Sequence, residues 1–227
     1  MNDNADTMDM VCLSSLRWDF PRQRPQNLMS RAARGRRVFF VEEPVFGEAT
    51  PGLEIRRRDC GVFAVTPHLR EGPDDAGAHA MEQALLLDEL FLEYDVCDYI
   101  LWYYTPTAIA FTWRLDPILV VYDCIDEPPS FRSGDPASSG AKRREAELLK
   151  LADVVFTDGD GLYEAMSHLH HNTHFFPGRF PMDEAPAPDD GAGCGDWDDA
   201  WARMMDLINL TLKKRYSSDC GIGDASF

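Results

Sequence analysis

Short apolar runs alternate with segments of helical periodicity along most of the chain, a pattern typical of a parallel sheet wrapped by helices. The run 118–127, "ILVVYDCIDE", is the richest in β-branched residues and predicts a central strand. The segment 52–67 predicts a pair of strands or a hairpin. Single strands are expected within 10–15, 36–43, 97–104, 154–159 and 173–178. Together these runs predict a doubly wound, mostly parallel, Rossmann-like sheet of six or seven strands.

Helical periodicity fills the segments between these runs. The expected helices lie at 25–35, 74–94, 137–153 and 160–169, with a further short one after Thr105-Pro106. Pro25 is suited to the first turn of its helix and Gly35 to its end. We therefore expect one α/β domain over residues 8–178.

The composition changes after Pro177. Residues 179–195 are rich in Pro, Gly, Ala and Asp and predict a linker. Residues 196–216 space Trp and aliphatic side chains at helical intervals, with acids in the first turn and Lys or Arg at the end, as the helix dipole prefers. This amphipathic helix requires a surface to pack on, and we expect it to dock on the domain. Residues 217–227 predict a disordered tail.

Charge narrows the classes of partner. The chain has 39 acidic and 22 basic residues, a formal net charge of −17, which disfavours nucleic-acid and anionic-membrane binding. Seven arginines between Arg17 and Arg37 nevertheless predict a basic corner that could steer a small anion. No apolar run is long enough for a transmembrane helix and the start is unlike a signal peptide, so a cytoplasmic protein with reduced cysteines is expected.

The first candidate site is the loop "LRWDFPRQRPQ", residues 16–26, between the first strand and its helix. Ligands of open α/β sheets bind beyond the carboxyl ends of the strands, where helix N-termini also point. The arginines could donate to phosphate or carboxylate, Trp18 could stack on a sugar ring, and Asp19 could hold a hydroxyl. The alternative is that Trp18 and Phe20 plug the apolar core while the arginines are solvated. The candidates here are Arg17, Trp18, Asp19, Arg22 and Arg24.

Two further strand ends supply candidates. Glu42 and Glu43 could receive ligand hydroxyls, as acids do at this point of dinucleotide folds, or could be ordinary surface carboxylates. Thr105 could contribute to a hydroxyl or anion site, or could simply cap the helix that follows.

The end of the run 118–127 places Asp123, Asp126 and Glu127 directly after a buried strand. Such carboxylates are costly unless they hydrogen-bond a partner. A polyhydroxyl ligand, a metal or the neighbouring arginines would serve.

Other motifs give weaker signals. His168, His170, His171 and His174 lie close together but cross an expected helix end, so a zinc site is not predicted. The chain carries no GxSxG, Walker or HExxH motif and no GxGxxG turn for a dinucleotide, which disfavours an oxidoreductase. We expect no cofactor and no bound metal, and no catalytic residue can be named.

Several blocks taken together resemble a known family. "CLSSLRWDFPRQRPQNLMSRAARGRRVFFVEEP", "WYYTPTA", "VVYDCIDE" and "VFTDGDGLYEA" resemble, over Val11 to Phe176, the N-terminal half of bacterial GT-B-type glycosyltransferases of the large retaining family 4. The resemblance implies a Rossmann-like domain that holds a carbohydrate or lipid-linked acceptor, as in cell-envelope polysaccharide synthesis, facing a second domain that holds a nucleotide-sugar. It also implies that the candidate loops above line the acceptor side of the cleft.

The chain departs from this family after residue 176. The family's donor-binding domain, about 150 residues long and bearing a basic residue and two glutamates, is expected there. Only the linker follows, and then a helix that resembles the family's last helix, which crosses back onto the N-terminal domain.

Two hypotheses follow. The first is a glycosyltransferase-like protein that binds a sugar or phosphorylated acceptor and is inactive unless a partner chain supplies the donor half. The second is a non-catalytic binding or interaction module, whose open cleft face meets a partner chain or a second copy.

Overall fold

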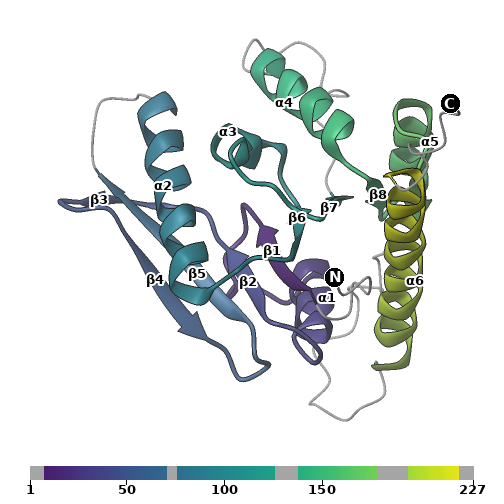
Figure 1. Cartoon of the computed structure of the whole chain (residues 1–227), viewed down its shortest axis with the longest axis horizontal. Coiled ribbons are helices and arrows are strands. Elements are labelled where there is room, and N and C mark those ends of the chain that lie inside the picture. The colour runs from purple at the N-terminus through teal and green to yellow at the C-terminus, as the bar shows by residue number, and fades with distance from the viewer. Residues whose placement is uncertain (1–7, 71–75, 126–137, 178–193, 220–227) are drawn as a thin grey trace, which may run out of the picture.

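The protein is an α/β fold built on one sheet. The computed structural model describes residues 8–70, 76–125, 138–177 and 194–219 (Figure 1). Within them a nine-stranded sheet forms the centre. Its strands are β1 (Asp9–Leu13), β2 (Val38–Val41), β3 (Val45–Glu48), β4 (Gly52–Arg57), β5 (Phe63–Arg70), β6 (Tyr99–Tyr103), β7 (Leu119–Cys124), β8 (Val154–Thr157) and β9 (Thr173–Phe175).

The strand order is that of a doubly wound sheet. It runs β3-β5-β2-β1-β6-β7-β8-β9, and every pair is parallel except β4 with β5. The chain proceeds from β1 to β2 on one side and later returns to add β6 on the other, so the strand order reverses between β1 and β6. The expected fold is therefore confirmed, and the hairpin expected within 52–67 is the antiparallel β4–β5 pair.

The expected number of six or seven strands was wrong, because the sheet has nine. The strand that lies outside all the expected ranges is β3, which follows β2 after Glu42 and Glu43. It pairs with the part of β5 that follows the part paired with β2. Val41 of β2 lies opposite Val65 of β5, and Val45 of β3 lies opposite His68 of β5. The two strands thus use the same edge of β5, separated by a short irregular stretch that contains Pro44.

Helices cover both faces of the sheet. One face is buried by α1 (Arg24–Ala32) and α6 (Cys194–Asp219), and the other by α2 (Ala76–Tyr94), α3 (Ile109–Thr112), α4 (Ser138–Leu151) and α5 (Asp160–Leu169). A short 3₁₀ turn, η2 (Pro106–Ala108), leads from β6 into α3. Alternate strand residues point into the two layers: Met10 and Cys12 lie on the α1 side, and Val11 and Leu13 on the α2 side.

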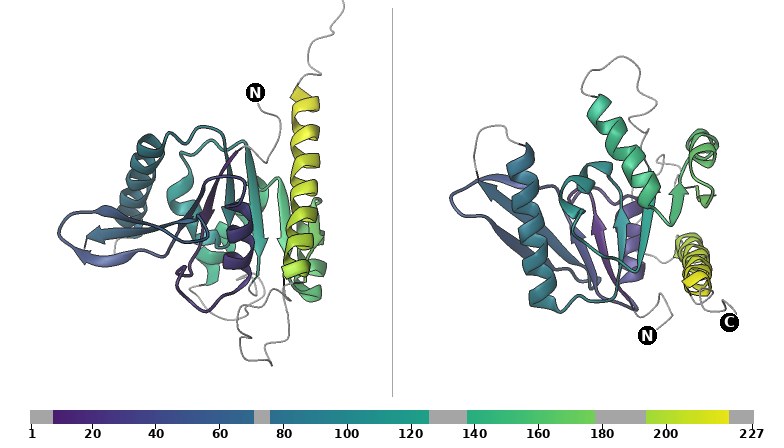
Figure 2. Two further views of the ribbon diagram at one scale, coloured as in Figure 1. Left: turned by 90° about the horizontal axis from the view of Figure 1, so that it is seen from below. Right: turned by 45° about the horizontal axis from the view of Figure 1, so that its top comes forward.

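The C-terminal helix packs on the domain, as expected. In Figure 2 α6 runs along the sheet as one long helix. Its apolar side is buried in the α1-side core through Trp197, Met204, Met205, Ile208 and Leu212. The helix spans Cys194–Asp219, where 196–216 was predicted. The predicted linker up to residue 193 and the tail from residue 220 lie outside the described residues.

Most of the basic corner is used inside the fold. Asp198 of α6 pairs with Arg31 (Nε to Oδ1, 2.6 Å) and Arg34 (Nη1 to Oδ1, 3.0 Å) of the α1 region. The Arg36 guanidinium lies 6.0 Å from the ring centre of Trp201. These arginines hold α6 on α1, which leaves less positive charge for a ligand than the sequence suggested.

No helix in the described part of the chain combines the length and apolar character that a membrane span requires. The free thiols include those of Cys12, Cys60, Cys97 and Cys124.

Candidate functional site

A pocket lies at the carboxyl edge of the sheet, at the point where the strand order reverses. Its volume is about 300 Å³. It lies between the ends of β1 and β2, the first half of α2, the η2–α3 turn and Arg144 of α4. This is the place where open α/β sheets bind their ligands. The lining residues are Leu13, Ser14, Ser15, Val41, Glu42, Glu43, Pro44, Phe46, Ala76, Ala80, Gln83, Thr105, Thr107, Ala108, Ala110, Phe111 and Arg144.

Hydroxyl groups line the sheet side of the pocket. Ser14 is buried and its Oγ accepts a hydrogen bond from the Leu16 N–H at 3.0 Å, while Ser15 is exposed. The Thr105 Oγ1 accepts from the Thr107 N–H at 3.4 Å and lies 2.9 Å from the Thr107 Oγ1. Thr105 is therefore the N-cap of η2, as the simpler interpretation predicted, and it also faces the pocket.

Among the described lining residues, Arg144 is the one cation. Arg144 lies on α4 and is partly buried, and no carboxylate among the described residues lies within ion-pair distance of its guanidinium. Its neighbour Arg143 is exposed and pairs with Glu147 at 3.3 Å on the outer side of the same helix. Arg144 can therefore donate to an anionic or hydroxylated group in the pocket.

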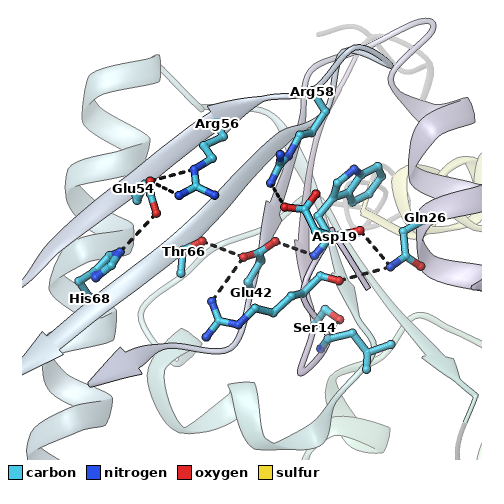
Figure 3. A network of polar contacts seen from close by, with 12 residues as sticks. Ser14, Asp19, Gln26, Glu42, Glu54, Arg56, Arg58, Thr66 and His68 are labelled. Atoms are coloured by element: carbon cyan, nitrogen blue, oxygen red, sulfur yellow. Dashed lines mark hydrogen bonds and ion pairs between the residues drawn. The ribbon is translucent and has the colours of Figure 1, made fainter. Parts of the chain in front are cut away.

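Glu42 organises the first loop rather than standing free. Its Oε1 accepts the backbone N–H of Trp18 at 2.6 Å and its Oε2 accepts the hydroxyl of Thr66 at 2.7 Å, with Arg17 3.8 Å from Oε2 (Figure 3). The carboxylate is buried, so these bonds compensate its desolvation. Glu43, next to it, is exposed at the pocket.

The other candidates of the first loop lie outside the pocket lining. Trp18 packs edge-on against Phe40, with ring centres 5.1 Å apart, and so contributes to the core. Asp19 pairs with Arg58 of the hairpin connection at 2.8 Å. Arg22 is exposed. Trp18 therefore packs on the core, as the alternative interpretation predicted, but Phe20 is exposed and Arg24 is buried, which that interpretation did not predict.

Arg24 and Asp123 form a buried ion pair below this edge. The Arg24 Nε lies 3.1 Å from both Asp123 oxygens, its Nη2 lies 2.9 Å from Oδ1, and its Nη1 donates to the Phe176 carbonyl at 2.7 Å. Burial alone lowers the pKa of Arg24, but the Asp123 carboxylate outweighs it, and the net pKa is raised. Burial and the same carboxylate raise the pKa of the Tyr104 hydroxyl.

This pair joins α1, β7 and the segment after β9, so its evident role is to fix the carboxyl edge. Of the three acids at the end of β7, Asp123 is thus neutralised by a neighbouring arginine, one of the possibilities that the sequence left open. Asp126 and Glu127 lie outside the described residues.

Of the predicted site residues, Glu42, Glu43 and Thr105 line the pocket. The lining also contains side chains that the sequence analysis did not single out. Phe46, Gln83, Phe111 and Arg144 come from β3, α2, α3 and α4. None of them stands in a motif. Only the packing of these elements over the sheet shows that they share a pocket.

The histidines do not form a metal site. No group of His, Cys, Asp and Glu side chains in the described part of the chain could hold a metal ion. The His170 Nε2 lies 2.9 Å from the Ala152 carbonyl and the His174 Nε2 lies 2.9 Å from the Asn172 Oδ1. These rings serve packing and local hydrogen bonding around β8 and β9.

No protein-family model and no curated protein matches the sequence. Solved structures do match. A sucrose-phosphate synthase from Thermosynechococcus elongatus has a TM-score of 0.54 at 12% identity, over 75% of this chain and 48% of that one. The catalytic domain of starch synthase IV from Arabidopsis thaliana has a TM-score of 0.50 at 10% identity, over 82% and 54%.

The fold is that of a GT-B Rossmann-like domain. A further sucrose-phosphate synthase structure from Thermosynechococcus elongatus matches over 89% of this chain and 98% of that one, with a TM-score of 0.53 and 12% identity. Against the first solved structures that match, by contrast, the chain spans about half of their length. The likeness at these identities concerns the fold alone.

Proposed function

We propose that this protein is a glycosyltransferase-like protein whose carboxyl-edge pocket binds a sugar or sugar phosphate of the acceptor type. The observation that carries the proposal is the pocket itself. It lies at the reversal of strand order, offers the hydroxyls of Ser15, Thr105 and Thr107, and is lined by Arg144. Hydroxyls and an arginine are suited to a hydroxylated ligand with a phosphate or carboxylate group.

The fold supports this class of function. The neighbours include trehalose-phosphate, sucrose-phosphate and starch synthases, one of them bound with UDP-2-fluoro glucose and another with ADP and acarbose. From these neighbours we infer only that the ligand of this chain is a sugar. We do not infer which sugar it is.

We further propose that transfer needs a donor-binding lobe from outside this chain. Residues 176–193 alone lie between β9 and α6, too few for a second Rossmann-type lobe of about 100 residues or more. Stabilisation of the leaving group is usually the largest contribution to the rate, and the cations for a leaving diphosphate would come from that lobe. A sucrose-phosphate synthase structure is matched over 98% of its chain, which supports the proposal that a domain of this size forms a folded unit.

Isothermal titration calorimetry tests the proposal. Hexoses and hexose 6-phosphates are titrated into the protein, with inorganic phosphate and nucleotide-sugars in parallel. We expect saturable binding of at least one hexose phosphate and none of the nucleotide-sugars. Absence of binding by every hexose and hexose phosphate would overturn it, and the interaction-module hypothesis would then replace it.

A pair of variants on α4 locates the binding. Arg144→Gln removes the cation of the pocket and is expected to weaken hexose phosphate about tenfold or more, because a charge-assisted hydrogen bond is lost. Arg143→Gln is the matched control, since Arg143 is 81% exposed and pairs with Glu147 away from the pocket. Equal weakening by both variants would place the ligand elsewhere.

A further inference from the structure

The pocket lining combines polar and apolar side chains. Besides the hydroxyls of Ser15 and Thr105 it includes apolar side chains from β3, α2 and the η2–α3 segment. Two aromatic rings, Phe46 of β3 and Phe111 of α3, are among them. They also include alanines, which have no hydrogen-bonding side chain and come from the elements that also contribute Gln83 and Thr107, namely Ala76, Ala80, Ala108 and Ala110.

Phe46 is exposed to an unusual degree for an aromatic residue of a strand. Phe46 is 52% exposed, and its ring packs edge-on against the ring of His79 in α2, with the two ring centres 4.9 Å apart. Exposed apolar side chains that line a pocket commonly contact a ligand. The Phe46 ring is held by β3 and His79, so it would lose little freedom on binding.

A fully hydroxylated ligand suits only part of this pocket. Each sugar hydroxyl turned toward the alanine and phenylalanine side chains would lose its water without gaining a partner, which is unfavourable. A ligand with a polar ring near the hydroxyls and an apolar group near the apolar side chains satisfies both parts. The volume of about 300 Å³ lies at the lower end of ligand pockets and limits the ligand to one small ring with a short apolar group.

We propose that the pocket recognises a glycoside with a short apolar aglycone, which Phe46 and Phe111 hold while the serine and threonine hydroxyls bind the sugar ring. This inference rests on the proposed function and narrows its ligand class. It also assigns to Phe46 the role of a specificity-determining residue. The aglycone packs on the exposed ring, and the sugar hydroxyls remain near the carboxyl ends of β1 and β6.

Matched pairs of ligands test the inference on the intact protein. Glucose, galactose and mannose are each compared with their phenyl and hexyl glycosides by calorimetry, with phenol and hexanol as aglycone-only probes. For the preferred sugar we expect the apolar glycoside to bind about tenfold more tightly than the free sugar, since an aromatic contact and its buried area are gained. The phenyl and hexyl compounds distinguish an aromatic from an alkyl aglycone, and a gain with either supports the proposal.

Two phenylalanine variants make the result specific. Phe46→Ala is expected to reduce the gain to about twofold or less, because the aglycone loses its aromatic contact. Phe20→Ala is the control, because Phe20 is similarly exposed, at 55%, but does not line the pocket. Circular dichroism of both variants checks that they fold.

The outcomes separate this inference from the proposed function. Equal affinities for sugars and their apolar glycosides would overturn the inference while the sugar-binding proposal stands. A gain that survives Phe46→Ala, or that phenol and hexanol alone reproduce in full, would also overturn it. No binding of any sugar, sugar phosphate or glycoside would overturn both.

Discussion

At the scale of single residues, the carboxyl edge depends on buried charges that neutralise one another. Arg24 and Asp123 lie 99 positions apart in the sequence, and both are almost completely buried. A buried ion pair contributes little net stability compared with an apolar pair, but loss of one partner leaves an uncompensated charge. The pair therefore matters mainly through the geometry that it fixes between α1, β7 and Phe176.

Asp123→Asn is predicted to destabilise the protein by about 3–5 kcal/mol, because Arg24 would stay buried without its counter-charge. Urea unfolding followed by tryptophan fluorescence measures the change. The double variant Arg24→Met with Asp123→Leu removes both charges and is expected to recover most of the loss. A single variant as stable as the unmodified protein would contradict this account.

His170 gives a prediction for pH. Burial lowers its pKa by more than hydrogen bonds with the backbone of Ala152 and Asn172 raise it, so the charged ring is disfavoured in the folded protein. The unfolded chain takes up this proton near pH 6.5 and the folded protein only below that, so stability falls as pH drops below about 6.5 and levels off beneath the folded pKa.

Urea midpoints between pH 7.5 and 5 measure this dependence. His170→Gln is expected to flatten the curve, since the side chain no longer titrates. An unchanged slope in the variant would show that other groups cause the effect.

Residue contacts also show what the sequence could and could not predict. Thr105 was correctly assigned as a possible cap, because capping depends on neighbours in the chain. Arg144 was missed, because an arginine in a charged helical segment is typically solvated, and nothing local indicates that η2 and α2 lie opposite it. The basic corner was seen in the sequence, but its pairing with Asp198 of α6 depends on a contact across 164 positions.

At the scale of elements, the strands with strong apolar runs were predictable and the weak edge strand was not. The burial of β1, β2, β6 and β7 leaves continuous apolar sequences that predict a parallel sheet. By contrast β3 has only four residues, three of them exposed, with Gly47 at φ +114°. Such a sequence carries no strand signal, and β3 exists because the edge of β5 beyond β2 is open for pairing.

The docking of α6 is the element most open to a direct test. Ile208 is fully buried between α6 and the sheet, while Leu210, two positions later, is 49% exposed. Ile208→Ala is predicted to cost about 2–5 kcal/mol through lost burial and a residual cavity. Leu210→Ala, the control, is expected to change stability by about 0.5 kcal/mol or less. Denaturant unfolding of both variants measures the difference, and similar effects of the two would contradict the observed packing.

At the scale of the whole molecule, charge and fold together limit the partners. The net charge of −17 is accompanied by a basic corner whose arginines bind inside the protein, to Asp123, Asp198 and Asp9 among others. We therefore predict no measurable binding of duplex DNA or heparin at about 150 mM salt. Fluorescence anisotropy with labelled DNA measures it, and a salt-dependent rise in anisotropy would show that the basic corner is available after all.

The last prediction concerns turnover, and it follows from the arrangement of the two halves of a GT-B enzyme. A sugar donor reacts only when its leaving diphosphate is stabilised, and in this proposal the required cations belong to a lobe outside this chain. Incubation of the protein with nucleotide-sugars and a bound acceptor should therefore release no nucleoside diphosphate above the protein-free rate, as a coupled assay would measure. Addition of a separately produced donor-binding lobe that completes the cleft should restore release, and Arg144→Gln should lower it again. If this chain alone released nucleoside diphosphate and Arg144→Gln abolished that release, the groups that activate the donor would lie within these 227 residues. That result would contradict the proposal that a separate lobe supplies them.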